Sequence, residues 1–275
     1  MPAGPPRAEI EAMNEDDGYF GEPVAAMYDE TSDKMFDPAV VGPTVDFLAQ
    51  LAGRGRALEL GIGTGRIALP LAARGVEVHG IDLSRAMVDR LRAKPGGEGI
   101  DVTIGDFATV KADGTFALAY LVYNTIMNLT SQAAQVACFR NAAAHLEPGG
   151  RFVIEAGVPD LQRLPPGERF VVFDASETHW GVDEYDVANQ GQISHHFDVR
   201  GGEVHLSSWP FRYAWPAELE RASAPGQLGQ EVDRRPDDVR IEHRVRRLVV
   251  RCCYGFVEVA ILVVHRPNLT NGLPR

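Results

Sequence analysis

A short stretch of the chain combines one acid with three closely spaced glycines: Glu59, Gly61, Gly63 and Gly65. Glycine has no Cβ atom, so alternate glycines let a ligand lie directly against the backbone. A second acid, Asp82, ends the next apolar run, where a carboxylate can accept hydrogen bonds from both hydroxyls of a ribose. This spacing therefore predicts a site for a ligand that carries a nucleoside.

The elements that must position these residues follow from the apolar pattern. Residues 56–60 form an apolar run that stops at glycine, residues 65–75 have helical spacing, and residues 76–82 alternate and end in the acid. A strand, a helix and a second strand in this order favour a parallel sheet with a right-handed crossover. Ligands bind such sheets beyond the carboxyl ends of the strands, where the glycines and Asp82 would lie.

Two kinds of cofactor fit a glycine-rich turn of this type. A dinucleotide needs a third small residue at position 66, and this chain has Arg66 there, so we expect that NAD does not bind. The pattern that remains, E-x-G-x-G-x-G, resembles that of the class I S-adenosylmethionine-dependent methyltransferases. The resemblance implies that the glycines border the methionine part of S-adenosyl-L-methionine, that Glu59 orients that end, and that Asp82 holds the ribose. We also expect Leu83, which follows Asp82, to be one of the cofactor-binding residues.

The resemblance extends over residues 18–160. Residues 101–107 are predicted to form a third strand that ends in Asp106 and Phe107. In the family, an Asp at this place accepts from the adenine amino group and its neighbour packs on the ring. A fourth strand with its loop, an amphipathic helix and a fifth strand follow at residues 116–129, 131–150 and 151–159. The implied fold is α/β, with a doubly wound, mostly parallel, Rossmann-like sheet.

Within that family, the nearest resemblance is to the bacterial small-molecule N- and O-methyltransferases of specialised metabolism. A helix with a Tyr-Asp pair, at residues 24–33, precedes the core, and in these enzymes its Tyr helps to close the cofactor site. Here that residue is Tyr28, with Tyr19 as a weaker alternate. The resemblance also implies that Tyr123 and Asn124 line the region of the donor methyl. Methyltransferases that act on amide or base nitrogens often carry Pro-Pro in this loop, so its sequence disfavours them.

Residues 161–215 differ from this core because four segments alternate as antiparallel strands do, with a two-glycine hairpin turn at residues 200–203. We expect an inserted antiparallel β cap, between the fifth strand and the last helix, that roofs the acceptor site. Its candidate bases are His179, His195 and His196. Adjacent strand residues point to opposite faces, so at most one of His195 and His196 faces the site. In the alternative interpretation, alternate residues of the cap's strands face solvent and its aromatic residues build its own core.

Composition narrows the classes of partner. The chain has 275 residues, 45% of them hydrophobic, and its net charge of -11 argues against a main affinity for nucleic-acid phosphates. Three cysteines, two of them adjacent, fit neither a disulfide framework nor a metal site, so we expect no metal and a reducing cytoplasm. The first residues lack the apolar region of a signal peptide. Charged residues interrupt the apolar run at 248–264, which argues against a membrane span.

The last part of the chain resembles the family least. A helix is expected to begin near residue 215, but Pro225 and the glycines that follow it would break that helix. Few aliphatic side chains follow, so we expect residues 221–246 to be mobile or irregular. Residues 248–264 can still close the sheet as an antiparallel hairpin. The predicted division is a cofactor-binding core at 1–160, the cap at 161–215 and an atypical tail at 216–275.

The function that these observations favour is methyl transfer from S-adenosyl-L-methionine to an amine or hydroxyl of a small molecule, by in-line displacement. Two alternatives stay open. One is a nucleic-acid methyltransferase whose Arg-rich tail contacts the nucleic acid, which the net charge disfavours. The other is a cofactor-binding protein with impaired catalysis. The sequence does not identify the acceptor, and it leaves a homodimer open.

Overall fold

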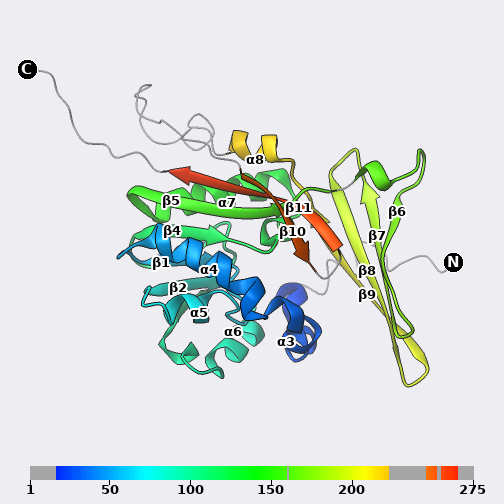
Figure 1. Cartoon of the computed structure of the whole chain (residues 1–275), viewed down its shortest axis with the longest axis horizontal. Helices are drawn as coiled ribbons and strands as arrows, with labels where there is room; N and C mark the ends of the chain where they lie inside the picture. The colour runs from blue at the N-terminus through cyan, green and yellow to red at the C-terminus, as the bar shows by residue number, and fades with distance from the viewer. Residues whose placement is uncertain (1–16, 160, 223–245, 253–254, 266–275) are drawn as a thin grey trace, which may run out of the picture.

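The structure, a computed structural model, describes residues 17–159, 161–222, 246–252 and 255–265; at residue 163 and in the last two segments only the backbone is described. Two sheets dominate it (Figure 1). Sheet A has the strand order β10-β11-β5-β4-β1-β2-β3, and sheet B has the order β6-β7-β8-β9. No helix within the described ranges is both long and apolar enough to cross a membrane.

Sheet A contains a parallel core of five strands. Neighbours β1 and β2, β2 and β3, β1 and β4, and β4 and β5 all pair in parallel, which confirms the predicted doubly wound sheet. Their carboxyl ends therefore meet at one edge. The strands are β1 (Ala57–Leu60), β2 (Val78–Asp82), β3 (Asp101–Ile104), β4 (Phe116–Leu121) and β5 (Leu146–Gly157).

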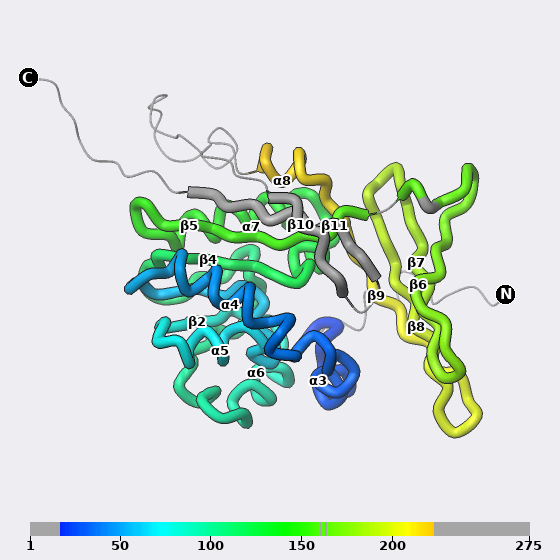
Figure 2. Tube along the Cα trace, in the orientation of Figure 1, coloured from blue at the N-terminus to red at the C-terminus, as the bar shows by residue number. Residues whose placement is uncertain are grey.

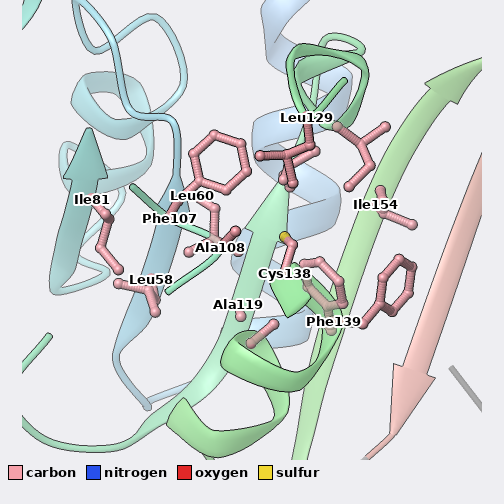
Figure 3. Packing of buried hydrophobic residues seen from close by; sticks show 14 of the residues in the cluster. Leu58, Leu60, Ile81, Phe107, Ala108, Ala119, Leu129, Cys138, Phe139 and Ile154 are labelled. Carbon is pink, nitrogen blue, oxygen red and sulfur yellow. The ribbon is translucent and has the colours of Figure 1, made fainter. Parts of the chain in front are cut away.

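Helices cover both faces of sheet A. Cys138 and Phe139 of α7 pack with Leu58, Ala119 and Ile154 of the strands in one apolar core (Figure 3). A second core lies between the opposite face and helices α4 and α5. The helices are α4 (Pro38–Ala52), α5 (Ala68–Ala72), α6 (Arg85–Arg92), α7 (Gln132–His145) and α8 (Pro216–Ala222).

Several elements differ in length from the sequence prediction. The helix expected at residues 65–75 is only α5, because the glycine turn occupies its beginning and Pro70 belongs in a first helical turn. The third strand ends at Ile104, before the predicted acid. The fifth strand begins at Leu146, with an irregular register against β4 across the Pro-Gly-Gly segment. The single helix expected at 24–33 is two short ones, α2 (Glu22–Ala25) and α3 (Tyr28–Thr31).

Sheet B is antiparallel throughout and lies beside the carboxyl edge of sheet A (Figures 1 and 2). Gly201 and Gly202, both with positive φ, form the predicted hairpin turn. Near its other end, β9 contacts the short helix η4 (Thr125–Asn128) that follows β4. The strands are β6 (Phe170–Ala175), β7 (His179–Asp186), β8 (Gly191–Arg200) and β9 (Glu203–Arg212).

The closing hairpin predicted at residues 248–264 is present. Strands β10 (Arg246–Cys252) and β11 (Gly255–His265) pair antiparallel, and β11 pairs antiparallel with β5. Of the segment 221–246, which we expected to be irregular, residues 221 and 222 end α8 and residue 246 begins β10. The rest of that segment lies outside the described residues.

Candidate cofactor and acceptor site

The glycine turn after β1 adopts a backbone that favours glycine at each of its three alternate positions. The φ angles of Gly61, Gly63 and Gly65 are 73°, 54° and 83°. A Cβ atom on Gly61 would also lie 2.6 Å from the Thr125 side chain, so the turn packs closely on the segment after β4. The turn therefore lies at the carboxyl edge of sheet A, and its conformation requires residues without a Cβ atom.

Asp82 joins the end of β2 to that turn. Its Oδ2 accepts a hydrogen bond from Gly63 N at 2.7 Å, and its Oδ1 accepts one from Ser84 N at 2.9 Å. Burial raises the pKa of Asp82, and these backbone donors oppose the rise. Each carboxylate oxygen has a second lone pair, so the group can still accept hydrogen bonds from a ligand. The adjacent Leu83 is 44% exposed, an apolar surface beside the acid.

Glu59 lies deeper, under the turn, with 4% of its surface exposed. Its Oε2 accepts a hydrogen bond from the Tyr120 hydroxyl at 2.9 Å. Burial raises the pKa of Glu59 to about 8, although the Tyr120 hydrogen bond and the charge of Arg66 both lower it. In the absence of a ligand the carboxyl group is therefore mostly protonated at neutral pH.

The segment before α4 covers the glycine turn. Thr64 Oγ1 donates to Asp29 Oδ1 at 2.6 Å, and Lys94 forms an ion pair with the same carboxylate. Ser84 Oγ donates to the Phe20 carbonyl at 2.6 Å. Tyr28 lies in this covering segment, with its ring edge-on to Phe20, and its pKa is raised by burial and affected by the charges of Arg66 and Asp82. The structure thus brings Tyr28 to the same edge as the glycines.

Asp106 and Phe107 occupy the turn after β3 and differ in exposure. Asp106 is exposed, and its Oδ1 accepts from Ala108 N at 2.8 Å. Phe107 is only 9% exposed and belongs to the core that packs on α7, with its ring edge next to Gly61 (Figure 3). Leu83, not Phe107, is therefore the more exposed apolar side chain at this end of the site.

The loop between β4 and η4 is strained. Tyr123 and Asn124 both have positive φ, 60° and 58°, which non-glycine residues adopt at a cost. Two hydrogen bonds from the end of β5 hold this backbone: Glu155 Oε2 accepts from Tyr123 N at 3.2 Å, and Asn124 Oδ1 accepts from Gly157 N. Burial raises the pKa of Glu155. Sequence reasoning missed Glu155, whose signal was an acid inside an otherwise apolar strand.

The three candidate histidines lie on neighbouring strands of sheet B. His179 Nδ1 lies 2.9 Å from Asp198 Oδ1, and His195 Nδ1 lies 2.8 Å from Ser208 Oγ. His196 packs at 4.5 Å between ring centroids on Trp209, and burial lowers its pKa to about 4. The strand alternation places His195 on the face opposite that of His196.

Comparisons with known proteins agree with this geometry. Residues 57–150 match the family described as methyltransferase domain. The cypemycin N-terminal methyltransferase of Streptomyces sp is 30% identical over 156 residues, which are 54% of this chain and 64% of that protein, so the match spans less than two thirds of its length.

Solved structures extend the likeness beyond that domain. The CcbJ methyltransferase of Streptomyces caelestis is 30% identical with a TM-score of 0.71, and the match covers 92% of this chain and 100% of that one. CalS10, an amino pentose methyltransferase of Micromonospora echinaspora solved with S-adenosylmethionine bound, is 20% identical with a TM-score of 0.58 over 82% of this chain and 89% of its own, which shows the fold alone. The likeness to CcbJ at this identity over its whole length, together with the matched domain, shows that the chain belongs to the S-adenosylmethionine-dependent methyltransferases.

Proposed function

We propose that this protein methylates an amine of a small molecule with S-adenosyl-L-methionine as the donor, in the cytoplasm and in specialised metabolism. One observation carries the choice of an amine: a half-buried carboxylate, Glu155, lies at the end of β5 beside the strained loop Tyr123–Asn124. Among the described residues Glu155 forms no ion pair. A carboxylate in that setting favours a cationic or N–H-bearing partner.

The edge of sheet A has the groups that the donor requires. The glycine turn borders the methionine end, and a buried acid lies near its amine. Two further acids and an exposed apolar side chain suit ribose and adenine. The positive φ of all three glycines and the spare lone pairs of Asp82 are the features that fit this ligand. The residues proposed to hold it are Tyr28, Glu59, Gly61, Gly63, Gly65, Asp82, Leu83, Asp106, Phe107 and Asn124.

The donor, when bound, supplies an activated methyl group, and the chain's residues align and shield the acceptor. An ammonium must lose a proton before its nitrogen can attack. Glu155 accepts that proton, and the burial that raises its pKa makes the carboxylate a stronger base. The short helices α2 and α3 lie in the segment that covers the glycine turn, and we expect this segment to limit the access of water to the donor.

Sheet B is the region that we propose selects the acceptor molecule. His179 and His196 share a face with Trp209 and Phe173, and the four side chains together form an aromatic surface. The division proposed from the sequence therefore has a functional meaning: a cofactor core at 1–160, an acceptor cap at 161–215 and a closing segment at 216–275. The cypemycin enzyme's name places its own methyl group on an N terminus, which is also an amine.

The test is a screen of amine and phenol pools with methyl-labelled S-adenosylmethionine, followed by mass spectrometry. We expect label in amines, and Glu155→Gln should lower turnover about 100-fold or more, as for loss of a general base. Binding of S-adenosylhomocysteine should not change in that variant. Glu147→Gln, an exposed acid of the same strand, is the matched control. Label in phenols alone, or in RNA or DNA, would contradict the amine assignment.

A further inference from the structure

Arg66 occupies the position that excludes a dinucleotide, and its charge acts on Tyr28, Glu59 and Glu155. Its guanidinium carbon is 3.6 Å from the centroid of the Tyr123 ring and 6.0 Å from that of Phe36. Together with Gly65 it lines a cavity of about 560 Å³ beside the glycine turn. The cation is thus held on an aromatic face at the end of the turn.

The other cations of this cavity are already paired. Lys94 forms an ion pair with Asp29 and donates to the Thr64 carbonyl at 2.8 Å. Arg74 lies 2.7 Å from a carboxylate oxygen of Asp46. Arg66, in contrast, forms no hydrogen bond or ion pair with any described residue, although a guanidinium has five N–H donors. Its donors are therefore available to a ligand.

The acids near Arg66 do not replace such a ligand. Glu59 is bonded to Tyr120, and Glu155 is bonded to the backbone of Tyr123. Arg66 lowers the pKa of both carboxyl groups, but burial is the larger effect and raises the pKa of each. No described carboxylate therefore pairs directly with Arg66.

We propose that Arg66 binds the carboxylate of the methionine end of the cofactor. That end carries an ammonium and a carboxylate on one carbon. The glycine turn has an acid, Glu59, before its first glycine and a cation, Arg66, after its last. Stacking on Tyr123 fixes the plane of the guanidinium, so its edge can donate two parallel hydrogen bonds to a carboxylate. This inference rests on the proposed function because it assumes the donor at this turn.

The experiment compares two ligands that differ only in the carboxylate. Isothermal calorimetry would measure S-adenosylhomocysteine and its decarboxylated analogue against the full chain and against Arg66→Gln. We expect Arg66→Gln to weaken S-adenosylhomocysteine about 10- to 150-fold, the range for hydrogen bonds to a charged group, and the analogue less than about threefold. Arg92→Gln, which removes an exposed arginine of α6, should change neither.

Arg66→Lys keeps the positive charge but loses the paired N–H donors of the guanidinium. It should therefore weaken the binding of S-adenosylhomocysteine only, and by a smaller factor than Arg66→Gln does. This variant decides the matter if circular dichroism shows that Arg66→Gln is unfolded. Equal losses for both ligands, or no loss for either, would overturn the role of Arg66 while leaving the proposed function intact. Failure of the unaltered chain to bind S-adenosylhomocysteine would overturn both.

Discussion

The cofactor edge of sheet A and the cap sheet B hold their polar side chains in different ways. At the edge, Asp82 and Asp106 accept hydrogen bonds from backbone N–H groups one or two residues away or on the neighbouring turn. In sheet B, His179 and His195 are held by side chains of other strands. The arrangement at the edge involves turn residues that form a recognisable sequence motif. The arrangement in sheet B depends on which residues the strand register places opposite one another.

Buried polar contacts join the two regions. Arg212, at the end of β9, donates to Gln135 of α7 at 2.5 Å and to Glu218 of α8 at 2.8 Å. Its side chain is 8% exposed, so this junction is internal. If the difference between the regions is functional, the cap can vary with the acceptor while the edge keeps the same cofactor.

The largest effect should come from removing the cap. We expect replacement of residues 165–210 by a flexible linker, with Arg212 retained, to abolish methyl transfer and to leave S-adenosylhomocysteine affinity within about threefold, since the proposed cofactor contacts lie in the core. Calorimetry and the labelled-methyl assay measure the two quantities. A folded truncation that no longer binds the cofactor would show that sheet B supports the edge, and the distinction between the regions would fail.

A smaller loss should follow Asp82→Ala at the edge. The change removes acceptors for ribose and for Gly63 N, so we expect S-adenosylhomocysteine affinity to fall by about 1.5–3 kcal/mol. Asp82→Asn keeps one acceptor and should lose less. Asp198→Ala, the partner of His179 in sheet B, serves as the control that leaves cofactor affinity unchanged. Unchanged affinity in Asp82→Ala would remove this residue from the cofactor site.

The features that could be predicted from the sequence are those that depend on residues close in the chain. The glycine turn, the parallel strands and the two-glycine hairpin of sheet B were predictable because each depends on residues close in the chain. The split of the expected helix at 24–33 was not, because α2 and α3 are shaped by contacts with Ser84 and the glycine turn.

Individual roles were harder still to predict. The burial of Phe107 depends on packing against α7, which no local pattern records. Arg66 and Glu155 come together through Tyr123, and these three residues lie on different strands or turns. A residue far away in the chain decides each of these environments, so spacing alone cannot reveal them.

The last prediction concerns Glu59, the acid at the edge that is held by a side chain, Tyr120, and therefore resembles the groups of sheet B. Burial raises its pKa from the ordinary value of 4.5 to about 8 in the folded protein. A raised pKa contributes stability that is fully present below the unfolded value and is lost as pH rises through the folded value. The free energy of unfolding of the unaltered chain, minus that of Glu59→Gln, should therefore fall between pH 4.5 and 8, by at most about 1.4 kcal/mol per pH unit, and level off above pH 8.

Urea unfolding at several pH values measures this difference, with Glu147→Gln as the exposed control. If the difference in unfolding free energy does not change across this pH range, Arg66 keeps Glu59 ionised. The charge of Arg66 would then outweigh the effect of burial on the pKa of Glu59.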